Sequence, residues 1–459
     1  MTRDFDAIVI GTGQAGPNLA RRLAAAGMQV AIIERKWFGG TCVNTGCTPT
    51  KTMVASAYAA HMARRAADFG VAIEGAVNVD MRRVKARKDA VSGSSRNGLE
   101  TSLKSMKNGT VYEGHGRFES PEEVSVGQDR LRAKKIFINV GTRANVPPFP
   151  GLELVDYLTN SSIINLESVP PHLVVVGGSY VGLEFGQMFC RFGSEVTIVE
   201  MGPRLVQRED EDVSEGIRDI LEREGIKIRL NAKCIAFSRR GEAITTHVDC
   251  TEGDSEVSGT HVLLAVGRRP NTDDLGLERA GVTMDSRGHI LVDDQLRTNV
   301  PGIWALGDCN GKGGFTHTSW NDSEIVAANL LNNDPRRVSD RILAYALYID
   351  PPLGRAGLTE SEVRRTGRRA LIGRRPMSSV SRAIEKSETL GFMKVIVDAE
   401  TSRILGAAIL GVGGDEVIHS ILDVMYAKAP YTVIQRAVHI HPTVSELIPT
   451  MLGDLKPLT

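Results

Sequence analysis

Two cysteines stand close together in the run GGTCVNTGCTPTK, at positions 39–51. Cys42 and Cys47 are separated by four residues, in a chain of 459 residues that has only six cysteines. A long helical pattern follows Cys47, with Pro49 near its first turn, so we expect Cys47 at a helix N-terminus, where free N–H groups and the helix dipole lower the pKa of a thiol. A bridge over so short a loop adds little entropic stabilisation, and no second pair completes a zinc site. The spacing favours a redox-active pair over a structural disulfide or a chance pairing.

The segment before these cysteines has the pattern of a dinucleotide-binding unit. An apolar strand at 7–10 runs into Gly11, Gly13 and Gly16, an alanine-rich helical stretch follows, and a second strand ends at Glu34. The glycines permit a tight turn and let the backbone approach a pyrophosphate at the helix N-terminus. The carboxylate at the end of the second strand can accept hydrogen bonds from an adenosine ribose.

The same unit recurs later in the chain, with Gly177, Ser179, Gly182 and Glu200 in the corresponding places and the same distance from first glycine to acid. Two matched units predict two dinucleotides. A dithiol cannot take hydride from NADH directly, whereas a flavin mediates between hydride and thiols, so we expect FAD on the first unit and NADH or NADPH on the second. Glu200 favours a free ribose hydroxyl and therefore NADH, although Arg204 is near enough to serve NADPH.

The order of patterns predicts an α/β fold with two Rossmann-like dinucleotide-binding domains, the second inserted in the first, and a C-terminal α+β dimerisation domain. Short alternating segments lead from the first unit to a Pro/Gly-rich linker near residue 150, which predicts an antiparallel excursion followed by a domain boundary. The run HVLLAVGRRPNT at 261–272 repeats the strand–glycine ending of the first domain, and 391–411 alternates like two strands about a turn. The expected ranges are 1–150 for the first part of the FAD domain, 151–269 for the NAD(P) domain, 270–339 for the return to the FAD domain and 340–459 for dimerisation.

Charge and hydropathy exclude several classes of protein. Lys plus Arg and Asp plus Glu number 55 each, so no overall field favours nucleic acid. No apolar run approaches the ~18 residues of a membrane helix, and no signal-peptide pattern precedes the first strand. Scattered cysteines fit a reducing compartment, so we expect a cytoplasmic protein without membrane partners. The remaining cysteines are expected to be ordinary buried or half-buried residues: Cys190, Cys234, Cys250 and Cys309.

Three motifs, in order along the whole chain, resemble those of the class I pyridine nucleotide–disulfide oxidoreductases, which include dihydrolipoamide dehydrogenase, glutathione reductase and mercuric reductase. GGTCVNTGCTPTK resembles the redox motif, ALGDCNGKGGFTHTSW the second flavin motif and HIHPTVSE the C-terminal signature. The resemblance implies a homodimeric enzyme in which electrons pass from NAD(P)H through FAD to a Cys42–Cys47 disulfide. The final acceptor would be a small-molecule disulfide or a soft metal ion.

The resemblance also assigns roles around the flavin. Asp308 would bind the ribityl chain, and Gly116 would contact FAD through its backbone. Lys51 and Glu184 would form an ion pair beside flavin N5, and Tyr180 would cover the nicotinamide site. The cofactor-binding candidates on the flavin side are Gly11, Gly13, Gly16, Glu34, Gly40, Thr41, Lys51, Gly116, Asp308, Phe315, Thr316 and His317, where the last three begin a helix aimed at the pyrimidine edge. Those on the nicotinamide side are Gly177, Tyr180, Gly182, Glu200, Gly267 and Arg268.

Acid–base chemistry is assigned to His441 and Glu446 by resemblance to a family dyad in which the carboxylate orients the imidazole. In the family this dyad comes from the partner subunit. Cys47 would stay as a thiolate against the flavin, Cys42 would attack the substrate, and His441 would shuttle the proton. His439, two residues earlier, is expected to be structural, and no resident metal is expected.

Within the family, the stretches CTPTKTMVASAYAAHMARR and YIDPPLGRAGLTESE resemble the mercuric-reductase-like branch, and FTHTSWNDSEIVAANLL is similar to copper(II)-reducing enzymes of reactive-chlorine resistance. The tail IPTMLGDLKPLT lacks the C-terminal cysteine pair of mercuric reductases, which argues against efficient mercury detoxification. The main alternative is dihydrolipoamide dehydrogenase, favoured by Glu200 and the His–Glu dyad, although GCTPTK departs from the common GCIPSK. An alternative of another class is an FAD-binding redox sensor or structural subunit without fast turnover.

Overall fold

The computed structural model describes residues 2–241, 243–249 and 255–458. The expectations on Cys250 and on the side chain of Cys234 lie outside the described part of the chain.

The first glycine unit builds a five-stranded parallel sheet. Its strands, in spatial order, are β19 (Ile303–Ala305), β8 (Ile136–Ile138), β2 (Ala7–Ile10), β3 (Val30–Glu34) and β4 (Gly109–Glu113). Successive residues of β2 point to opposite faces and all are buried. Ala7 and Val9 pack with helices α1 (Ala15–Ala25) and α9 (Thr316–Leu331), whereas Ile8 and Ile10 pack with a second, smaller sheet. A parallel sheet covered on both faces explains why the sequence shows an unbroken apolar run here.

The smaller sheet is the expected antiparallel excursion. It has the order β1 (Thr2–Asp4), β7 (Asp129–Arg132), β6 (Glu123–Val126) and β5 (Gly116–Ser120), in which β5, β6 and β7 are antiparallel and β1 joins β7 in parallel. The short pair β9 (Thr142–Ala144) and β18 (Arg268–Pro270) joins the two ends of the second unit, because β9 precedes the linker near residue 150 and β18 follows the last strand of that unit.

The second glycine unit builds another parallel sheet, with the order β10 (Tyr157–Leu158), β17 (His261–Leu264), β11 (His172–Val176), β12 (Glu195–Val199) and β13 (Lys227–Arg229). Helices α6 (Tyr180–Phe192) and α7 (Glu211–Arg223) pack on it. An antiparallel sheet of β14 (Lys233–Arg240), β15 (Ala243–Asp249) and β16 (Glu256–Gly259) is appended to it.

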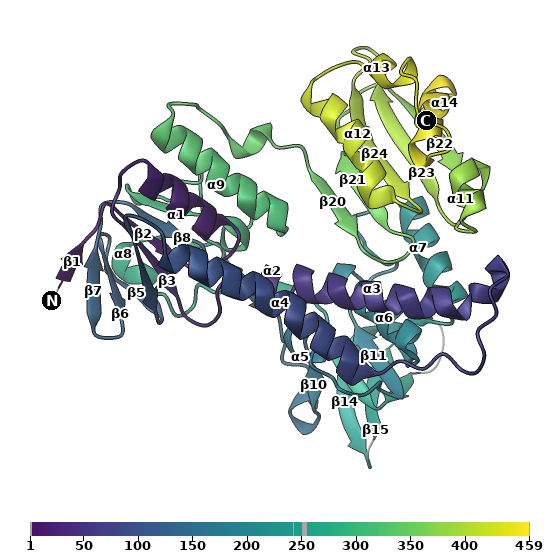
Figure 1. Ribbon diagram of the computed structural model, residues 1–459, viewed down its shortest axis with the longest axis horizontal. Helices are drawn as coiled ribbons and strands as arrows, with labels where there is room; N and C mark the ends of the chain where they lie inside the picture. The colour runs from purple at the N-terminus through teal and green to yellow at the C-terminus, as the bar shows by residue number, and fades with distance from the viewer. Residues whose placement is uncertain (1, 242, 250–254, 459) are drawn as a thin grey trace.

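The chain then returns to the first sheet. Strand β19 pairs with β8 in parallel, and α9 lies beside α1 although some 300 residues separate them in sequence (Figure 1). The second unit is therefore inserted in the first, as predicted. The residue ranges assigned to the domains stay predictions.

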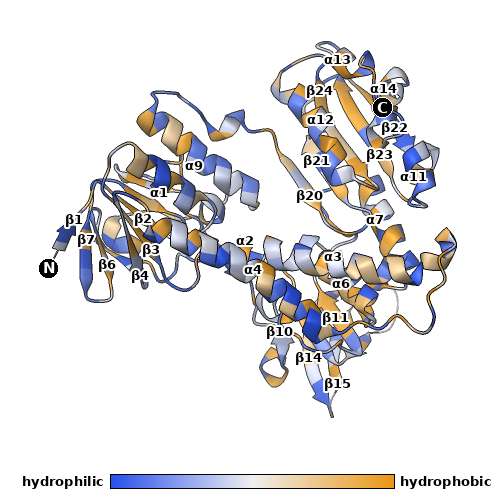
Figure 2. Cartoon of the chain, viewed as in Figure 1, coloured by the Kyte–Doolittle hydropathy of each residue, from blue (hydrophilic) through white to orange (hydrophobic). Residues whose placement is uncertain are grey.

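The C-terminal part is one antiparallel sheet with the order β20 (Ala344–Leu347), β21 (Leu353–Gly357), β24 (Ile404–Leu410), β23 (Phe392–Asp398), β22 (Ala370–Pro376) and β25 (Lys456–Pro457). Its central strands are the most apolar part of this region in Figure 2. The predicted pair of strands at 391–411 is confirmed as β23 and β24. The helices here are α10 (Glu360–Arg365), α11 (Ser381–Glu385), α12 (Gly414–Tyr426), α13 (Thr432–Gln435) and α14 (Ile448–Gly453).

Helices α2 (Gly40–Asn44), α3 (Cys47–Arg64) and α4 (Met81–Lys104) lie between β3 and β4, and the first two carry the cysteine motif. In Figure 1, α3 and α4 run from the first sheet toward the second unit and the C-terminal sheet. The short helices α5 (Asn160–Ile163) and α8 (Leu277–Ala280) complete the set. No helix of the described residues combines the length and apolar character needed to span a bilayer.

Candidate active site

In the first glycine turn, backbone carbonyl groups lie so close to Gly11 and Gly16 that neither residue has room for a side chain. A Cβ on Gly11, whose φ is +103°, would lie 2.3 Å from the carbonyl oxygen of Asn139, and a Cβ on Gly16 would lie 2.2 Å from the carbonyl oxygen of Gly11. Only glycine fits both positions without a backbone shift. The side-chain amide nitrogen of Asn139 is buried beside this turn and has no hydrogen-bond partner among the described residues. A buried donor without a partner fits an acceptor supplied by a ligand.

Glu34 closes this turn from the end of β3. Its Oε2 accepts hydrogen bonds from the Thr12 backbone N–H at 3.1 Å and from the Thr12 hydroxyl at 2.5 Å, and its Oε1 accepts one from the Lys36 N–H at 2.9 Å. A carboxylate can accept about four such bonds, so one acceptor position on Oε1 stays free.

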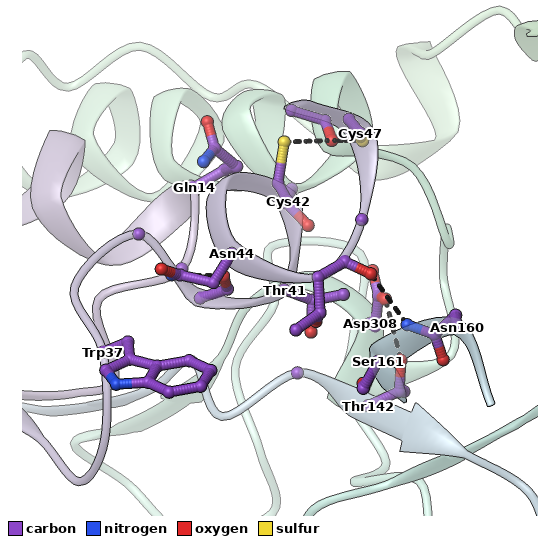
Figure 3. A pocket seen from close by; sticks show the side chains of 18 of the residues that line it. Gln14, Trp37, Thr41, Cys42, Asn44, Cys47, Thr142, Asn160, Ser161 and Asp308 are labelled. Atoms are coloured by element: carbon purple, nitrogen blue, oxygen red, sulfur yellow. Dashed lines mark hydrogen bonds between the residues drawn. The ribbon is translucent and has the colours of Figure 1, made fainter. Parts of the chain in front are cut away.

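A cavity of about 900 Å³ begins at this turn and runs past the two cysteines to the second unit. That volume lies near the upper end of the range for small-molecule and cofactor sites. The cavity is lined by these sequence candidates: Gly11, Gly13, Glu34, Gly40, Thr41, Cys42, Cys47, Lys51, Gly116, Tyr180, Glu184, Arg268, Asp308, Phe315, Thr316 and His317. Figure 3 shows Cys42, Cys47, Thr41 and Asp308 around it.

Helix geometry brings the two cysteines together. Cys42 lies in the short helix α2 and Cys47 is the first residue of α3, with both present as free thiols. The Thr316 hydroxyl, at the first residue of α9, lies 3.3 Å from the Cys42 sulfur and 3.1 Å from the Cys47 sulfur. Two helix N-termini therefore meet at the sulfur pair, and both favour negative charge there.

The two thiols differ in acidity. A hydrogen bond from Cys42 lowers the pKa of Cys47 to about 6, with further help from Thr316 and Lys51, against the opposing effect of burial. The same hydrogen bond, together with burial, raises the pKa of Cys42 far above its ordinary value. Cys47 is therefore the thiolate at neutral pH, and Cys42 holds the proton.

Lys51 and Glu184 form an ion pair at the wall of the cavity, with Nζ 2.6 Å from Oε2. Glu184 is only 6% exposed, and its Oε1 accepts a hydrogen bond from the Tyr348 N–H at 3.1 Å. The Lys51 ammonium also lies 4.6 Å from the centre of the Tyr348 ring. The pair is thus fixed from three elements: α3, α6 and the segment after β20.

Asp308 belongs to a second polar group in the cavity. Its Oδ2 accepts a hydrogen bond from the Thr142 hydroxyl at 2.9 Å, and that hydroxyl accepts one from Arg268 Nε at 2.8 Å. Burial lowers the pKa of Arg268, whereas the charge of Asp308 opposes that shift. The arrangement leaves Asp308 Oδ1 available for a ligand hydroxyl.

The second glycine turn repeats the first in backbone but lies outside this cavity. A Cβ on Gly182 would lie 1.9 Å from the Gly177 carbonyl oxygen. Glu200 Oε2 accepts from the Gly178 N–H at 2.6 Å, and Oε1 accepts from the Gly202 N–H at 2.7 Å and from Gln207 Nε2 at 3.1 Å. Tyr180, the first residue of α6, lies in the cavity wall between the two units.

The remaining candidates are not brought to the cavity within one chain. His441 Nδ1 lies 2.7 Å from Glu446 Oε2, so the dyad forms, but the His441 side chain is 74% exposed. His439 has a different partner, the Ser445 carbonyl oxygen at 2.9 Å from its Nδ1. The sequence candidates outside the cavity lining are Gly16, Gly177, Gly182, Glu200, Gly267, His441 and Glu446. Cys190 is half-buried and Cys309 is buried, as expected.

Three residues of the site were missed from the sequence. Asn139 follows directly after β8, a strand-end position that could have signalled it. Thr142 and Tyr348 act through contacts with residues more than 100 positions away, and no local pattern marks them.

Comparisons with known proteins agree with this geometry. Residues 5–323 match the family model of the pyridine nucleotide-disulphide oxidoreductases, and residues 343–452 match the dimerisation domain of that family. A protein of Escherichia coli (strain K12) described as probable pyridine nucleotide-disulfide oxidoreductase RclA is 36% identical, over 98% of this chain and 99% of its own. A dihydrolipoyl dehydrogenase of Thermus scotoductus is 32% identical, over 97% of this chain and 96% of its own, and mercuric reductases also match.

A solved structure is similar over the whole chain. It is described as the Cu(II) complex of the HOCl-induced flavoprotein disulfide reductase RclA from Escherichia coli. The TM-score is 0.90 at 34% identity, and the match covers 98% of this chain and 99% of that chain.

Proposed function

The chain belongs to the pyridine nucleotide-disulphide oxidoreductase family, and from this premise we propose that it uses NAD(P)H to reduce a small disulfide or a soft metal ion through Cys42 and Cys47. The family consists of flavoprotein oxidoreductases, so the protein is an enzyme of that type. The observation that carries the proposal is the sulfur pair itself. Both sulfurs lie in the cavity within hydrogen-bond distance of Thr316, and the pKa of Cys47 is lowered to about 6.

The residues of the first unit fit FAD. The glycine turn leaves no side chain in the way, Asn139 offers an unpartnered buried donor, and Glu34 and Asp308 each keep a free acceptor position. Bound FAD supplies two-electron exchange between a nicotinamide and thiols. The ammonium of Lys51, paired with Glu184, would place a positive charge beside the flavin.

The thiol chemistry follows from the acidity of the two cysteines. Cys42 keeps its proton at neutral pH, so its attack on a substrate disulfide needs a base. The Cys42 sulfur forms a mixed disulfide with one substrate sulfur, and the other substrate thiolate leaves with the proton. Cys47, already a thiolate, then attacks the Cys42 sulfur and closes the Cys42–Cys47 disulfide, and the second substrate sulfur leaves as a thiolate that takes up a proton from water. Two electrons from NAD(P)H restore the dithiol, so one NAD(P)H and one proton are consumed for each disulfide.

The base we assign is His441 of a second copy of the chain. Its Nδ1 is fixed by Glu446 and its ring is exposed, but it does not line the cavity of its own chain. The neighbouring residues Val438 and Ile440 are 99% and 79% exposed, which supports burial of this segment against another subunit. The family match of residues 343–452 to a dimerisation domain supports a homodimer.

A soft metal ion is included in the substrate class because a thiolate pair is a soft ligand set. The similar RclA structure is described as a Cu(II) complex. At this site, two Cu(II) ions would each take one electron from the dithiol. A second candidate is dihydrolipoamide dehydrogenase activity, favoured by the relative from Thermus scotoductus and by Glu200.

For the nicotinamide we propose NADH, because Glu200 would repel a 2′-phosphate. Arg204 donates to the Gln207 carbonyl oxygen at 3.1 Å, which engages the cation that could otherwise hold that phosphate. We also propose a cytoplasmic location, because six cysteines scattered over a long chain fit a reducing compartment.

The decisive experiment replaces Cys42 by serine in the flavin-loaded protein. We expect normal flavin content and NAD(P)H-driven bleaching, with disulfide turnover lower by about a thousandfold or more, as on removal of a covalent nucleophile. Cys190→Ser is the matched control, because Cys190 lies outside the cavity. Full disulfide turnover by Cys42→Ser would refute the role of Cys42, and protein that takes up no FAD would refute the whole proposal.

The substrate is resolved by one panel of lipoamide, glutathione disulfide, Cu(II), Hg(II), a quinone and oxygen, each with NADH and NADPH. We expect Cu(II) or a small disulfide to give the highest Cys42-dependent rate. A dominant rate on lipoamide would favour the second candidate. Slow rates throughout, with FAD bound, would indicate a redox sensor or structural subunit instead.

A further inference from the structure

The Tyr180 ring lies at the meeting point of the second unit and the C-terminal sheet. It meets the Phe315 ring edge-on at 6.0 Å between centroids and the Tyr345 ring edge-on at 5.6 Å. The Phe315 and Tyr345 rings are themselves stacked at 5.4 Å. The Arg208 guanidinium lies 5.2 Å from the centre of the Tyr180 ring and 5.7 Å from that of Tyr345. Tyr180 is therefore enclosed by two rings and one cation.

The two tyrosines are held in different ways. The Tyr180 hydroxyl is buried and makes no hydrogen bond of ordinary geometry with a described residue; apart from an interaction with the Tyr345 hydroxyl, ring contacts hold it in place. The Tyr345 hydroxyl donates a hydrogen bond to Glu209 Oε1 at 2.5 Å, and Tyr345 is 5% exposed. Tyr345 is thus anchored by a carboxylate, whereas Tyr180 is held by its contacts with Tyr345, Phe315 and Arg208.

The anchor is a buried carboxylate held by charges from the C-terminal sheet. Glu209 is buried, and Arg355 on β21 lies 3.6 Å from its Oε2. Arg355 also lies 3.4 Å from Asp210, and Lys394 on β23 lies 3.0 Å from Asp210. Removing one partner from such a buried set is costly, so Glu209 and Tyr345 cannot move independently of the C-terminal sheet.

We propose that Tyr345 and Arg208 form a latch that keeps the Tyr180 ring closed over the nicotinamide side of the cavity, and that Glu209 is the positioning residue that fixes Tyr345. The inference rests on the proposed function, in which the nicotinamide enters where Tyr180 lies. None of Tyr345, Arg208 and Glu209 belongs to the glycine turn or to the sulfur pair.

The latch predicts the direction in which nicotinamide affinity changes when its contacts are removed. A nicotinamide that binds only when Tyr180 has moved has an apparent Kd equal to its intrinsic Kd divided by the open fraction. Contacts that exist only in the closed position lower that fraction. Their removal must therefore tighten nicotinamide binding, the opposite of what general damage to the site would do.

The first test is Tyr345→Leu, which removes two ring contacts and the hydrogen bond but keeps an apolar side chain in place. We expect the Kd of NAD⁺, measured by calorimetry on the flavin-loaded protein without turnover, to fall about threefold to tenfold, the factor that an aromatic pair contributes. NADP⁺ is titrated in parallel. In turnover, KM for NADH falls and kcat is unchanged. Unchanged or weaker binding in folded protein overturns the latch.

Arg208→Gln provides a variant that does not touch the core, since Arg208 is exposed. We expect the Kd of NAD⁺ to fall about twofold to fivefold, and Arg208→Lys, which keeps a cation, to restore most of the original value. Equal effects of both variants, or none, contradict a cation held over the rings. The matched control is Tyr58→Phe, because Tyr58 also donates to a glutamate, Glu388 at 3.0 Å, away from the cavity.

Tyr180→Ala separates failure of the latch from failure of the proposed function. We expect it to tighten NAD⁺ binding by itself and to cancel any further effect of Tyr345→Leu, because residues that act through one another are not additive. Unchanged binding on Tyr180→Ala overturns both the proposed role of Tyr180 and the latch. A response to Tyr180→Ala but not to Tyr345→Leu overturns the latch alone.

Discussion

The two glycine turns of this protein share a backbone and differ in their surroundings. A Cβ on Gly11 would lie 2.3 Å from the Asn139 carbonyl oxygen, and a Cβ on Gly177 would lie 2.4 Å from the Ala265 carbonyl oxygen. In both turns the carboxylate after the second strand accepts one N–H from the turn and one from two residues further along the chain. The same strand–turn–helix sequence has therefore produced the same local structure twice.

The difference lies in the third donor to each carboxylate. Glu34 takes it from the buried hydroxyl of Thr12, within the turn itself, whereas Glu200 takes it from the exposed side chain of Gln207. The first turn also opens into the deep cavity, and Glu200 does not line it. A buried donor fixed by the turn suits a nucleotide that stays bound. An exposed side chain that a ribose can displace suits one that exchanges.

The largest effect on nucleotide binding should come from replacing the first glycine of each turn, in separate variants. Alanine at Gly11 or Gly177 places a Cβ in contact with backbone at positive φ, at a cost of about 2–5 kcal/mol. We expect Gly11→Ala to be purified without flavin, and Gly177→Ala to keep its visible absorbance but no longer be bleached by NADH. Loss of flavin from Gly177→Ala would show that the two turns do not serve separate nucleotides.

The next largest effect should be a difference in thiol reactivity between Cys47, on α3, and Cys190, on α6 of the second unit. The pKa of Cys47, at the N-terminus of α3, is lowered from 9.0 to about 6, chiefly by its hydrogen bond with Cys42. Burial raises the pKa of Cys190, near the C-terminus of α6, to about 11. Iodoacetamide should therefore alkylate Cys47 with a midpoint near pH 6 and leave Cys190 unmodified at pH 7, as mass spectrometry of the two peptides would report.

The free energy of unfolding should depend on pH through the ionisation of the same thiol, that of Cys47. Because the folded pKa of Cys47 lies below the unfolded value of 9.0, its deprotonation stabilises the native state. That contribution is complete above pH 9, falls as the pH drops toward 6 and is absent below that.

Cys42→Ala should raise the alkylation midpoint. A midpoint that stays near 6 in this variant would contradict the assigned cause.

A smaller effect is expected from the charge on Glu200. Glu200→Gln keeps an acceptor oxygen but removes the repulsion of a 2′-phosphate, so the preference for NADH over NADPH should fall about tenfold, as on loss of a hydrogen bond to a charged group. Steady-state kinetics with both nucleotides measure it. Glu34→Gln is the control: it should loosen flavin and leave the NADH:NADPH ratio unchanged.

The smallest effect should come from Gln207. Its amide occupies an acceptor position on Glu200 Oε1, so Gln207→Ala frees that oxygen and should lower KM for NADH about threefold, the worth of one net hydrogen bond. KM for NADPH should not change. A rise in KM for NADH would mean that Gln207 holds the nucleotide rather than competing with it.

Much of this molecule could be predicted from short-range patterns. The glycines at Gly11 and Gly177 mark positive φ, the acids at Glu34 and Glu200 follow at a fixed distance, and the helix after Cys47 begins at that residue. The antiparallel excursion, the insertion of the second unit and the strands at 391–411 follow from the same kind of pattern. Roles that came from family resemblance, such as those of His441 and Asp308, needed more than the pattern.

The sequence by itself determined the two nucleotide turns and the position of Cys47, because these depend on φ, on helix termini and on spacing within about 30 residues. Only the tertiary structure decided what meets at the sulfur pair: Thr316 arrives from 269 residues beyond Cys47, and Glu184 from 133 beyond Lys51. It also decided that Tyr345 would be anchored by Glu209, across 136 residues. Such contacts are set by how separate sheets pack on one another, and packing leaves no signal in the local order of residues.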